Sequence, residues 1–124
     1  PRRILFAAGG ETIGAHDARF ASVAGASIDN IAMRYAAANG LPQGQLSDVL
    51  YESLERFGHK LGGHPDFTQN DPRAPDDADW VLLLQLDSDE QMMWGDSGVA
   101  NFFIRRQDLA RADFSRVAFH WDCY

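Results

Sequence analysis

The sequence predicts an α+β domain in which two amphipathic helices pack on a mainly antiparallel sheet. Helical periodicity is confined to the first half of the chain, and strand-like apolar runs dominate the end. A stretch rich in glycine, proline and acidic residues separates them. At 124 residues the chain fits a single domain. Within it we expect a mainly helical part (1–58), a long loop (59–79) and a strand-rich part (80–124).

Both expected helices show one apolar face. Between Ile28 and Tyr35 the apolar residues recur at the spacing of one helix face, which predicts a helix that ends near Asn39. A second helix is expected over Asp48–Phe57, with acidic residues near its positive end. The residues expected to cap or end these helices are Ser27 and Gly40 for the first, and Ser47 and Gly58 for the second.

The remaining elements are expected to be mostly strands. The nearly continuous apolar run Trp80–Leu86 predicts a central strand that is buried on both faces. Val99–Ile104 and Arg116–Trp121 predict two further strands, and Asp108–Ala112 predicts one helical turn. The run Ile4–Ala8 predicts a short strand or another buried segment near the start.

The charge of the chain argues against two classes of partner. Eleven basic and 18 acidic residues give a net charge of −7. Nucleic acids and anionic membranes require a basic face, and Arg2-Arg3 and Arg105-Arg106 are too short to make one. We therefore expect no nucleic-acid or membrane partner. The acidic surface serves solubility or favours a basic protein partner.

The sequence also predicts a cytoplasmic location. Cys123 is the single cysteine, so no internal disulfide can form. The start of the chain lacks a signal-peptide pattern, and no apolar run approaches the ~20 residues of a membrane span. Because the chain begins at Pro1 rather than methionine, we expect it to be part of a longer protein.

Several motifs in the second half resemble one protein family when they are taken together. They are Leu61-Gly62-Gly63-His64-Pro65-Asp66, Gln69-Asn70-Asp71, Trp80–Asp89, Met93–Gly98, Asn101–Ile104, Asp108-Leu109 and Trp121-Asp122-Cys123. In this order and spacing, roughly residues 50–124 resemble the YwqG-like family of bacterial proteins of unknown function.

This resemblance implies an α+β fold in which an earlier segment, absent from this chain, precedes the present one. The chain would then be the C-terminal part of a larger YwqG-like fold, or a shortened member. The family has no established reaction. Relatives near secreted-toxin loci imply a toxin-neutralising or partner-binding role.

An acidic group follows the expected central strand. Asp87, Asp89 and Asp96 could supply oxygen ligands to Ca²⁺ or Mg²⁺, with Glu90 beside them. The segment does not match the EF-hand loop, because Gln91 stands at a ligand position. The competing interpretation is that Asp87 and Asp89 shape a turn through hydrogen bonds to backbone amides.

Other polar residues give weaker signals. His59, His64, His120 and Cys123 could suggest zinc, but no Cys-x₂₋₄-Cys pair accompanies them. Cys123 could be a nucleophile beside a histidine, although its place near the chain end gives it little support. The loop Gly9–Gly14 matches neither the G-x-G-x-x-G pattern nor the Walker pattern of phosphate-binding loops. We therefore expect no catalytic residue and no cofactor.

Trp94 and Met93 place large apolar groups beside the acidic turn. If they are exposed they suit a protein interface, and if they are buried they belong to the core.

Two functional hypotheses follow. The first is a non-catalytic protein-interaction module, and the alternative is a small-ligand or divalent-metal-binding domain, or an enzyme. The candidate binding residues are Gly62, Gly63, Pro65, Gln69, Gln85, Asp87, Asp89, Trp94, Gly95 and Asp96, of which Asp87 and Asp89 are the weak metal candidates. Convergence of their polar groups in one pocket would favour the alternative, and dispersal over separate turns would favour the first hypothesis.

Overall fold

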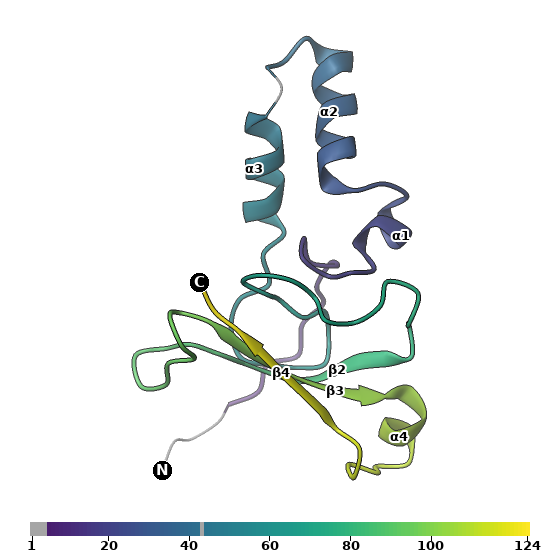
Figure 1. The fold of residues 1–124 in the computed structure, drawn as a ribbon, viewed down its shortest axis with the longest axis vertical. Helices are drawn as coiled ribbons and strands as arrows, with labels where there is room; N and C mark the ends of the chain where they lie inside the picture. The colour runs from purple at the N-terminus through teal and green to yellow at the C-terminus, as the bar shows by residue number, and fades with distance from the viewer. Residues whose placement is uncertain (1–4, 43) are drawn as a thin grey trace.

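A computed structural model describes residues 5–42 and 44–124 and confirms the α+β class. Its sheet has four strands in the order β1-β2-β3-β4, and each neighbouring pair is antiparallel. The elements, in chain order, are α1 (Phe20–Ala24), α2 (Ile28–Asn39), α3 (Gln45–Ser53), β1 (Lys60–Leu61), β2 (Trp80–Asp87), β3 (Val99–Arg105), α4 (Arg106–Ala110) and β4 (Ala118–Asp122). Figure 1 shows the sheet at one end of the molecule, with α1, α2 and α3 at the other.

The apolar run Trp80–Leu86 forms β2, a central strand as predicted. β2 pairs with β3 from Trp80–Arg105 to Asp87–Val99, with an irregularity between Leu82 and Leu84. Its fully buried residues, Leu82 and Gln85, are on one face, and the other positions are half-buried. Burial on both faces, expected from the sequence, is therefore complete on one face only.

Local capping signals locate α2 but not α3. The Asn30 amide donates to Ser27 Oγ at 3.3 Å at the start of α2, and Gly40 closes the helix with a left-handed φ of 65°. In contrast, α3 covers Gln45–Ser53, so the predicted range Asp48–Phe57 begins and ends too late. Ser47 lies inside the helix instead of capping it, and Gly58 lies beyond the helix end.

A tertiary contact follows the end of α3. The Leu54 amide closes the last turn by donating to the carbonyls of Leu50 and Tyr51, both at 3.1 Å. Beyond it, the carbonyls of Arg56 and Gly58 accept hydrogen bonds from the Gln85 side chain on the sheet. Residues 56–58 are therefore attached to the sheet instead of extending the helix.

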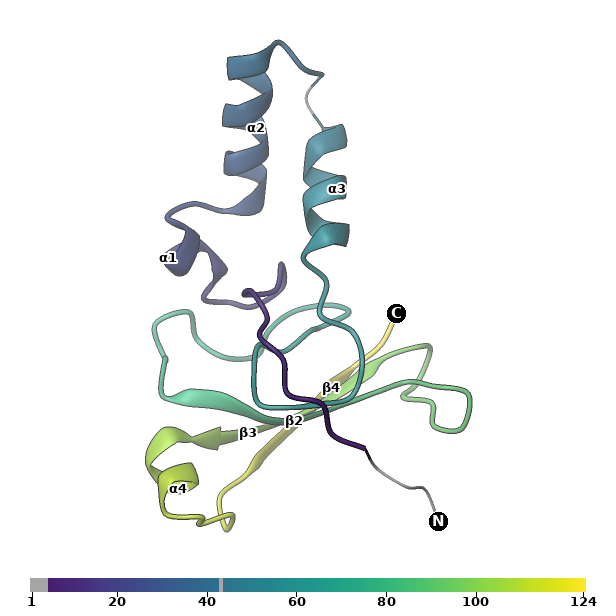
Figure 2. The ribbon, with the colours of Figure 1, turned by 180° about the vertical axis from the view of Figure 1, so that it is seen from behind.

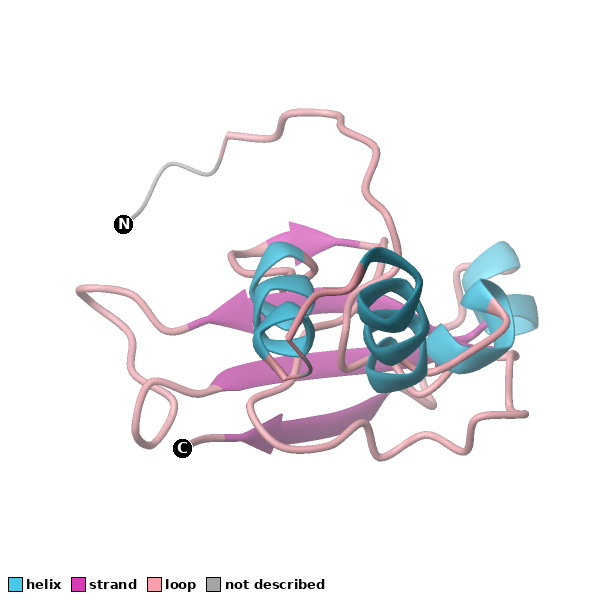
Figure 3. Cartoon of the chain, turned by 90° about the horizontal axis from the view of Figure 1, so that it is seen from above, coloured by secondary structure: helices cyan, strands magenta, loops and turns pink. Residues whose placement is uncertain are grey.

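The two longer helices pack on each other rather than lying along the sheet. Ile28, Ala32 and Ala36 are the buried residues of α2, and α2 and α3 form a hairpin that projects away from the sheet (Figures 1 and 2). The predicted packing of both helices on the sheet therefore differs from the structure. Viewed from above, the helices stand end-on over the strands (Figure 3).

Four smaller predictions need adjustment. Ile4 lies outside the described residues, and 5–8 form no strand, with Leu5 and Phe6 exposed. The predicted loop 59–79 contains β1, which pairs with β2. The helical turn α4 begins at Arg106 instead of Asp108, and β4 covers Ala118–Asp122 instead of Arg116–Trp121. In the described parts of the chain, no helix has the length and apolar character of a membrane span.

Two buried amide side chains attach the loop 54–69 to the sheet. Gln85 and Asn101 are neighbours in the β2–β3 register, and both have 0% exposure. Gln85 Nε2 donates to the carbonyls of Arg56 (2.8 Å) and Gly58 (3.0 Å), and its Oε1 accepts from the Asp66 amide (2.8 Å). Asn101 Nδ2 donates to the carbonyl of Asp66 at 2.8 Å. Backbone groups of the loop are thus hydrogen-bonded to side chains of the sheet.

The hydrophobic core lies under the same loop. Phe67, Leu82 and Phe103 form its buried cluster, and Trp80 packs against them. The rings of Phe67 and Phe103 stack with their centroids 6.3 Å apart. Arg73 lies over Phe103, 4.8 Å from the ring centroid. One face of the sheet is therefore covered by loop residues instead of by helices.

A buried ion-pair cluster ties the N-terminal segment to the loop. Asp17, whose side chain has 0% exposure, contacts Arg19 (2.5 Å), Arg73 (3.3 Å) and His64 (3.4 Å). Burial alone would raise the pKa of Asp17, but hydrogen bonds from Arg19 and the charge of Arg73 lower this pKa to about 2. Asp71 accepts from Arg73 and from the Ala18 amide, which completes the link.

We predict that Gln85→Leu will lower the free energy of unfolding by about 3 kcal/mol, because it leaves two buried carbonyls and one amide without partners. Urea denaturation of the purified protein measures this loss. Gln107→Leu, at an exposed position on α4, is the matched control and should change stability little. Equal losses in the two variants would contradict the role assigned to Gln85.

Candidate functional site

The acidic residues that sequence analysis proposed as metal ligands shape turns in the structure. Asp87 Oδ2 accepts from the Gly58 amide at 2.6 Å, and Asp87 Oδ1 accepts from the Ser88 amide at 2.8 Å. Asp89 Oδ1 accepts from the amides of Gln91 and Met92, at 2.8 and 2.9 Å. Among residues 5–42 and 44–124, no group of three or more His, Cys, Asp or Glu side chains could hold a metal ion.

The candidate binding residues between positions 62 and 69 shape the backbone of the loop and attach it to the chain end. Gly62 and Gly63 have left-handed φ values of 69° and 78°, which turn the chain after β1. Pro65 is buried. The Gln69 amide donates to Asp122 Oδ2 at 2.8 Å, and Gln69 Nε2 donates to the Cys123 carbonyl at 2.6 Å. Gln69 therefore joins the loop to the end of β4.

The histidines and the cysteine lie in separate surroundings. His59 Nε2 lies 3.0 Å from Asp89 Oδ2, and His64 lies beside Asp17. The His120 ring contacts Phe67, with centroids 6.0 Å apart. Cys123 lies against Gly95, which has a positive φ of 59°. The structure thus brings together neither a zinc set nor a nucleophile–base pair from these four residues.

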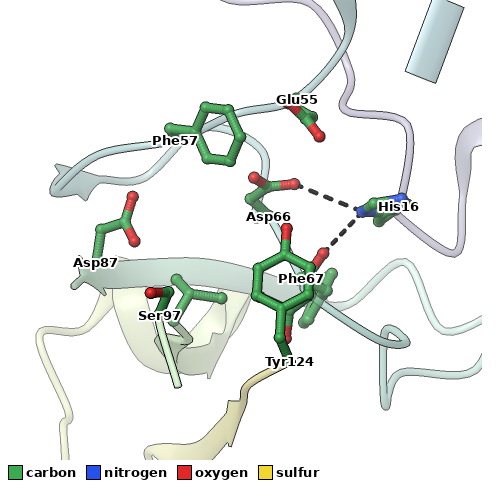
Figure 4. A pocket seen from close by; sticks show the side chains of 10 residues that line it. His16, Glu55, Phe57, Asp66, Phe67, Asp87, Ser97 and Tyr124 are labelled. Carbon is green, nitrogen blue, oxygen red and sulfur yellow. Dashed lines mark hydrogen bonds and ion pairs between the residues drawn. The ribbon is translucent and has the colours of Figure 1, made fainter. Parts of the chain in front are cut away.

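A small cavity lies between the loop 54–58, the loop 65–68 and the chain end (Figure 4). The side chain of Asp66 points into it and faces His16, with Asp66 Oδ1 3.8 Å from His16 Nδ1. His16 Nδ1 also lies 2.7 Å from the Phe67 carbonyl. The cavity has a volume of about 30 Å³, which suits one or two water molecules rather than a metabolite.

Burial raises the pKa of two carboxyls that line this cavity. Burial raises the pKa of Asp66, and hydrogen bonds from the amides of Arg56 and Phe67 offset this only in part. Burial and then the charge of Asp66 raise the pKa of Glu55 as well. Asp66 Oδ1 is buried without a hydrogen-bond partner in the described structure, and so is Thr68 Oγ1. These groups can hold a proton or order a water molecule.

Sequence analysis did not single out His16 and Asp66 as a pair. They are separated by 50 positions in the sequence, and only the docking of the loop onto β2 brings them together. The segment Gly9–Gly14, which precedes His16, contains no motif that predicts the contact between His16 and Asp66. A second, open hollow of about 250 Å³ lies beside the cavity, between His16, Tyr51 and Asp71.

The most extensive feature is the face of the sheet opposite the loop. Residues that pair across neighbouring strands point to the same face. Leu61 pairs with Leu84, Leu84 with Phe102, and Phe102 with Phe119, so one apolar row crosses all four strands. In this row Leu61 is 59% exposed and Phe119 is 52% exposed.

A second row lies beside the first. Leu86 pairs with Ala100, which is fully buried, and Ala100 pairs with Trp121, which is 46% exposed. The Trp94 ring packs on Phe119 with centroids 6.2 Å apart, and Met93 next to it is 62% exposed. We call the two rows the apolar sheet face; it consists of Leu61, Leu84, Leu86, Ala100, Phe102, Phe119 and Trp121.

Of the predicted site residues, Trp94 and Gly95 therefore lie at the border of an exposed apolar surface. Asp96 is exposed next to them, and its carbonyl accepts from the Tyr124 amide at 3.2 Å. Gln85 and Pro65, in contrast, are buried on the loop side of the sheet. The predicted residues divide between the two faces instead of converging.

Comparison with known families identifies one match. A family model described as a domain of unknown function (DUF1963) matches residues 3–123, so the chain belongs to this family. No curated protein shows significant similarity to the chain.

We predict that Asp66→Asn will stabilise the protein relative to the unchanged chain as the pH rises. A carboxyl whose folded pKa is raised adds an ionisation cost to the folded state, and this cost is absent below the unfolded pKa and grows as pH rises through the folded pKa. Unfolding free energies of both proteins, measured between about pH 3 and about pH 7, test this prediction. Asp96→Asn, at an exposed site, is the control, and a pH-independent difference for Asp66→Asn would contradict the prediction.

Proposed function

We propose that this member of the DUF1963 family is a non-catalytic protein-interaction module that binds its partner through the apolar sheet face. The observation that carries the proposal is the continuous row from Leu61 to Phe119 across four strands, with both ends about half exposed. Contiguous exposed apolar surface is rare on monomeric proteins, and it often marks a binding surface.

The composition of this surface supports a protein partner. Aromatic residues and methionine are enriched at the centres of protein interfaces, and here Phe119, Trp121, Trp94 and Met93 lie together. A net charge of −7 favours a partner with a basic rim around its apolar patch.

The alternative function, binding of a small ligand or a metal, has less support. The polar residues proposed for ligand binding form hydrogen bonds with backbone groups instead. Gln85 bonds to the loop 56–66, Asp87 bonds to Gly58 and Ser88, and Gln69 bonds to the chain end. The cavity beside Asp66 has a volume of about 30 Å³, which is too small for a metabolite, and the hollow of about 250 Å³ beside it is open to solvent.

The subgroup of the family and the cellular location also belong to this proposal. The motifs between Leu61 and Cys123 favour a bacterial, YwqG-like member of the family that forms the C-terminal part of a larger fold, and the single cysteine favours a cytoplasmic location. In this setting, binding and neutralising a toxin is the form of interaction that the resemblance suggests.

We predict that the protein, used as bait in a lysate of its own cells, will capture one stoichiometric partner. Phe119→Ser and Trp121→Ser should each reduce the captured amount by about tenfold, because they remove large aromatic anchors from the exposed β4 side of the apolar sheet face. Quantitative mass spectrometry of the captured proteins gives the ratio.

The matched controls are Met33→Ser and Tyr35→Ser, which remove exposed apolar side chains from α2 and leave the sheet unchanged. These two variants should capture as much of the partner as the unchanged protein does. Loss of capture in the helix variants with retention in the sheet variants would overturn the assignment of the surface. Absence of any captured protein would count against the interaction function itself.

A further inference from the structure

We infer that two copies of this chain associate through antiparallel pairing of their β4 strands, about a two-fold axis that passes between the His120 residues of the two copies. This goes beyond the proposed function, because it concerns the backbone edge of the sheet and a second copy of the chain. The apolar sheet faces of the two copies would join into one surface.

The first argument is the open edge of β4. β4 pairs with β3 on one side, and no strand of the described chain lies on its other side. Figure 3 shows β4 as the outermost strand of the sheet. Alternate backbone N–H and C=O groups of Ala118–Asp122 therefore point away from the sheet.

The edge also lacks three common devices that prevent pairing with another chain. Natural edge strands carry proline, lysine or a bulge that prevents pairing with another chain. The sequence of β4 is Ala-Phe-His-Trp-Asp, with no proline and no lysine, and its pairing with β3 runs in register over all five residues. The opposite edge, β1, has only two residues.

The second argument is that the strand is complementary to itself. A two-fold axis at His120 places Phe119 of one copy opposite Trp121 of the other, and it does so twice. Both side chains point to the apolar sheet face and are about half exposed, at 52% and 46%. Aromatic cross-strand pairs of this kind stabilise antiparallel sheets.

A single pair of five-residue strands is small compared with the roughly 800 Å² per partner of a stable interface. We therefore predict a reversible dimer, whose mass increases with concentration across the micromolar range. Sedimentation equilibrium of the purified protein alone, with no partner present, measures this association. A monomer at every concentration would overturn the inference.

Cysteine cross-linking tests the register. In a Cys123→Ser background, His120→Cys should form a disulfide-linked dimer under mild oxidation, because residues on the axis have Cα atoms about 4.5–5.5 Å apart, within the disulfide range. Ala118→Cys, at an exposed position of the same strand, is the matched control. Its counterpart in the other copy is displaced by four residues along the strand, too far for a disulfide, so this variant should form little disulfide-linked dimer.

Cross-linking at position 118 and not at 120, or at neither position in a protein that still dimerises, would overturn pairing about His120. Circular dichroism shows whether each variant keeps its fold. These experiments contain only this chain, so they can fail while capture of a different protein succeeds, and the reverse also holds.

Discussion

The hydrogen bonds of Gln85 and Asn101 determine which face of the sheet the chain covers. Both amides are buried, and together they bind the backbone of Arg56, Gly58 and Asp66. Because the loop 54–69 occupies this face, the helix hairpin stands beyond it. The opposite face then lacks a helical layer over its central rows, and this exposure is the physical basis of the proposed interaction surface.

A second set of contacts fixes the N-terminal segment on the loop. Asp17, Arg19, Arg73 and Asp71 form charged pairs that are mostly buried, and Arg73 also lies over Phe103 in the core. A buried pair adds little net stability because desolvation offsets the attraction, but an unpaired member would be costly. The cluster therefore specifies how residues 14–20 join the loop, and this brings His16 to the cavity beside Asp66.

Much of the fold could be predicted because its signals are local. The period of α2, its Ser27 cap and the apolar runs of β2 and β3 are visible in short windows of sequence. The strand β1 and the use of Gln85 depend on contacts between segments about 23 to 29 residues apart. For the site, Trp94 could be proposed as an interface residue, whereas the four-strand apolar row appears only with the register.

Hydrogen exchange tests most directly whether the loop is a fixed layer of the sheet. The Asp66 amide donates to buried Gln85 Oε1 at 2.8 Å, so its exchange should be as slow as that of the amides within β2 and β3. Backbone amides in the α2–α3 hairpin, which projects from the sheet, should exchange faster (Figure 1). If Asp66 exchanged as fast as the exposed amides near Asn70, the loop would not be held by the amide side chains, and the account would be contradicted.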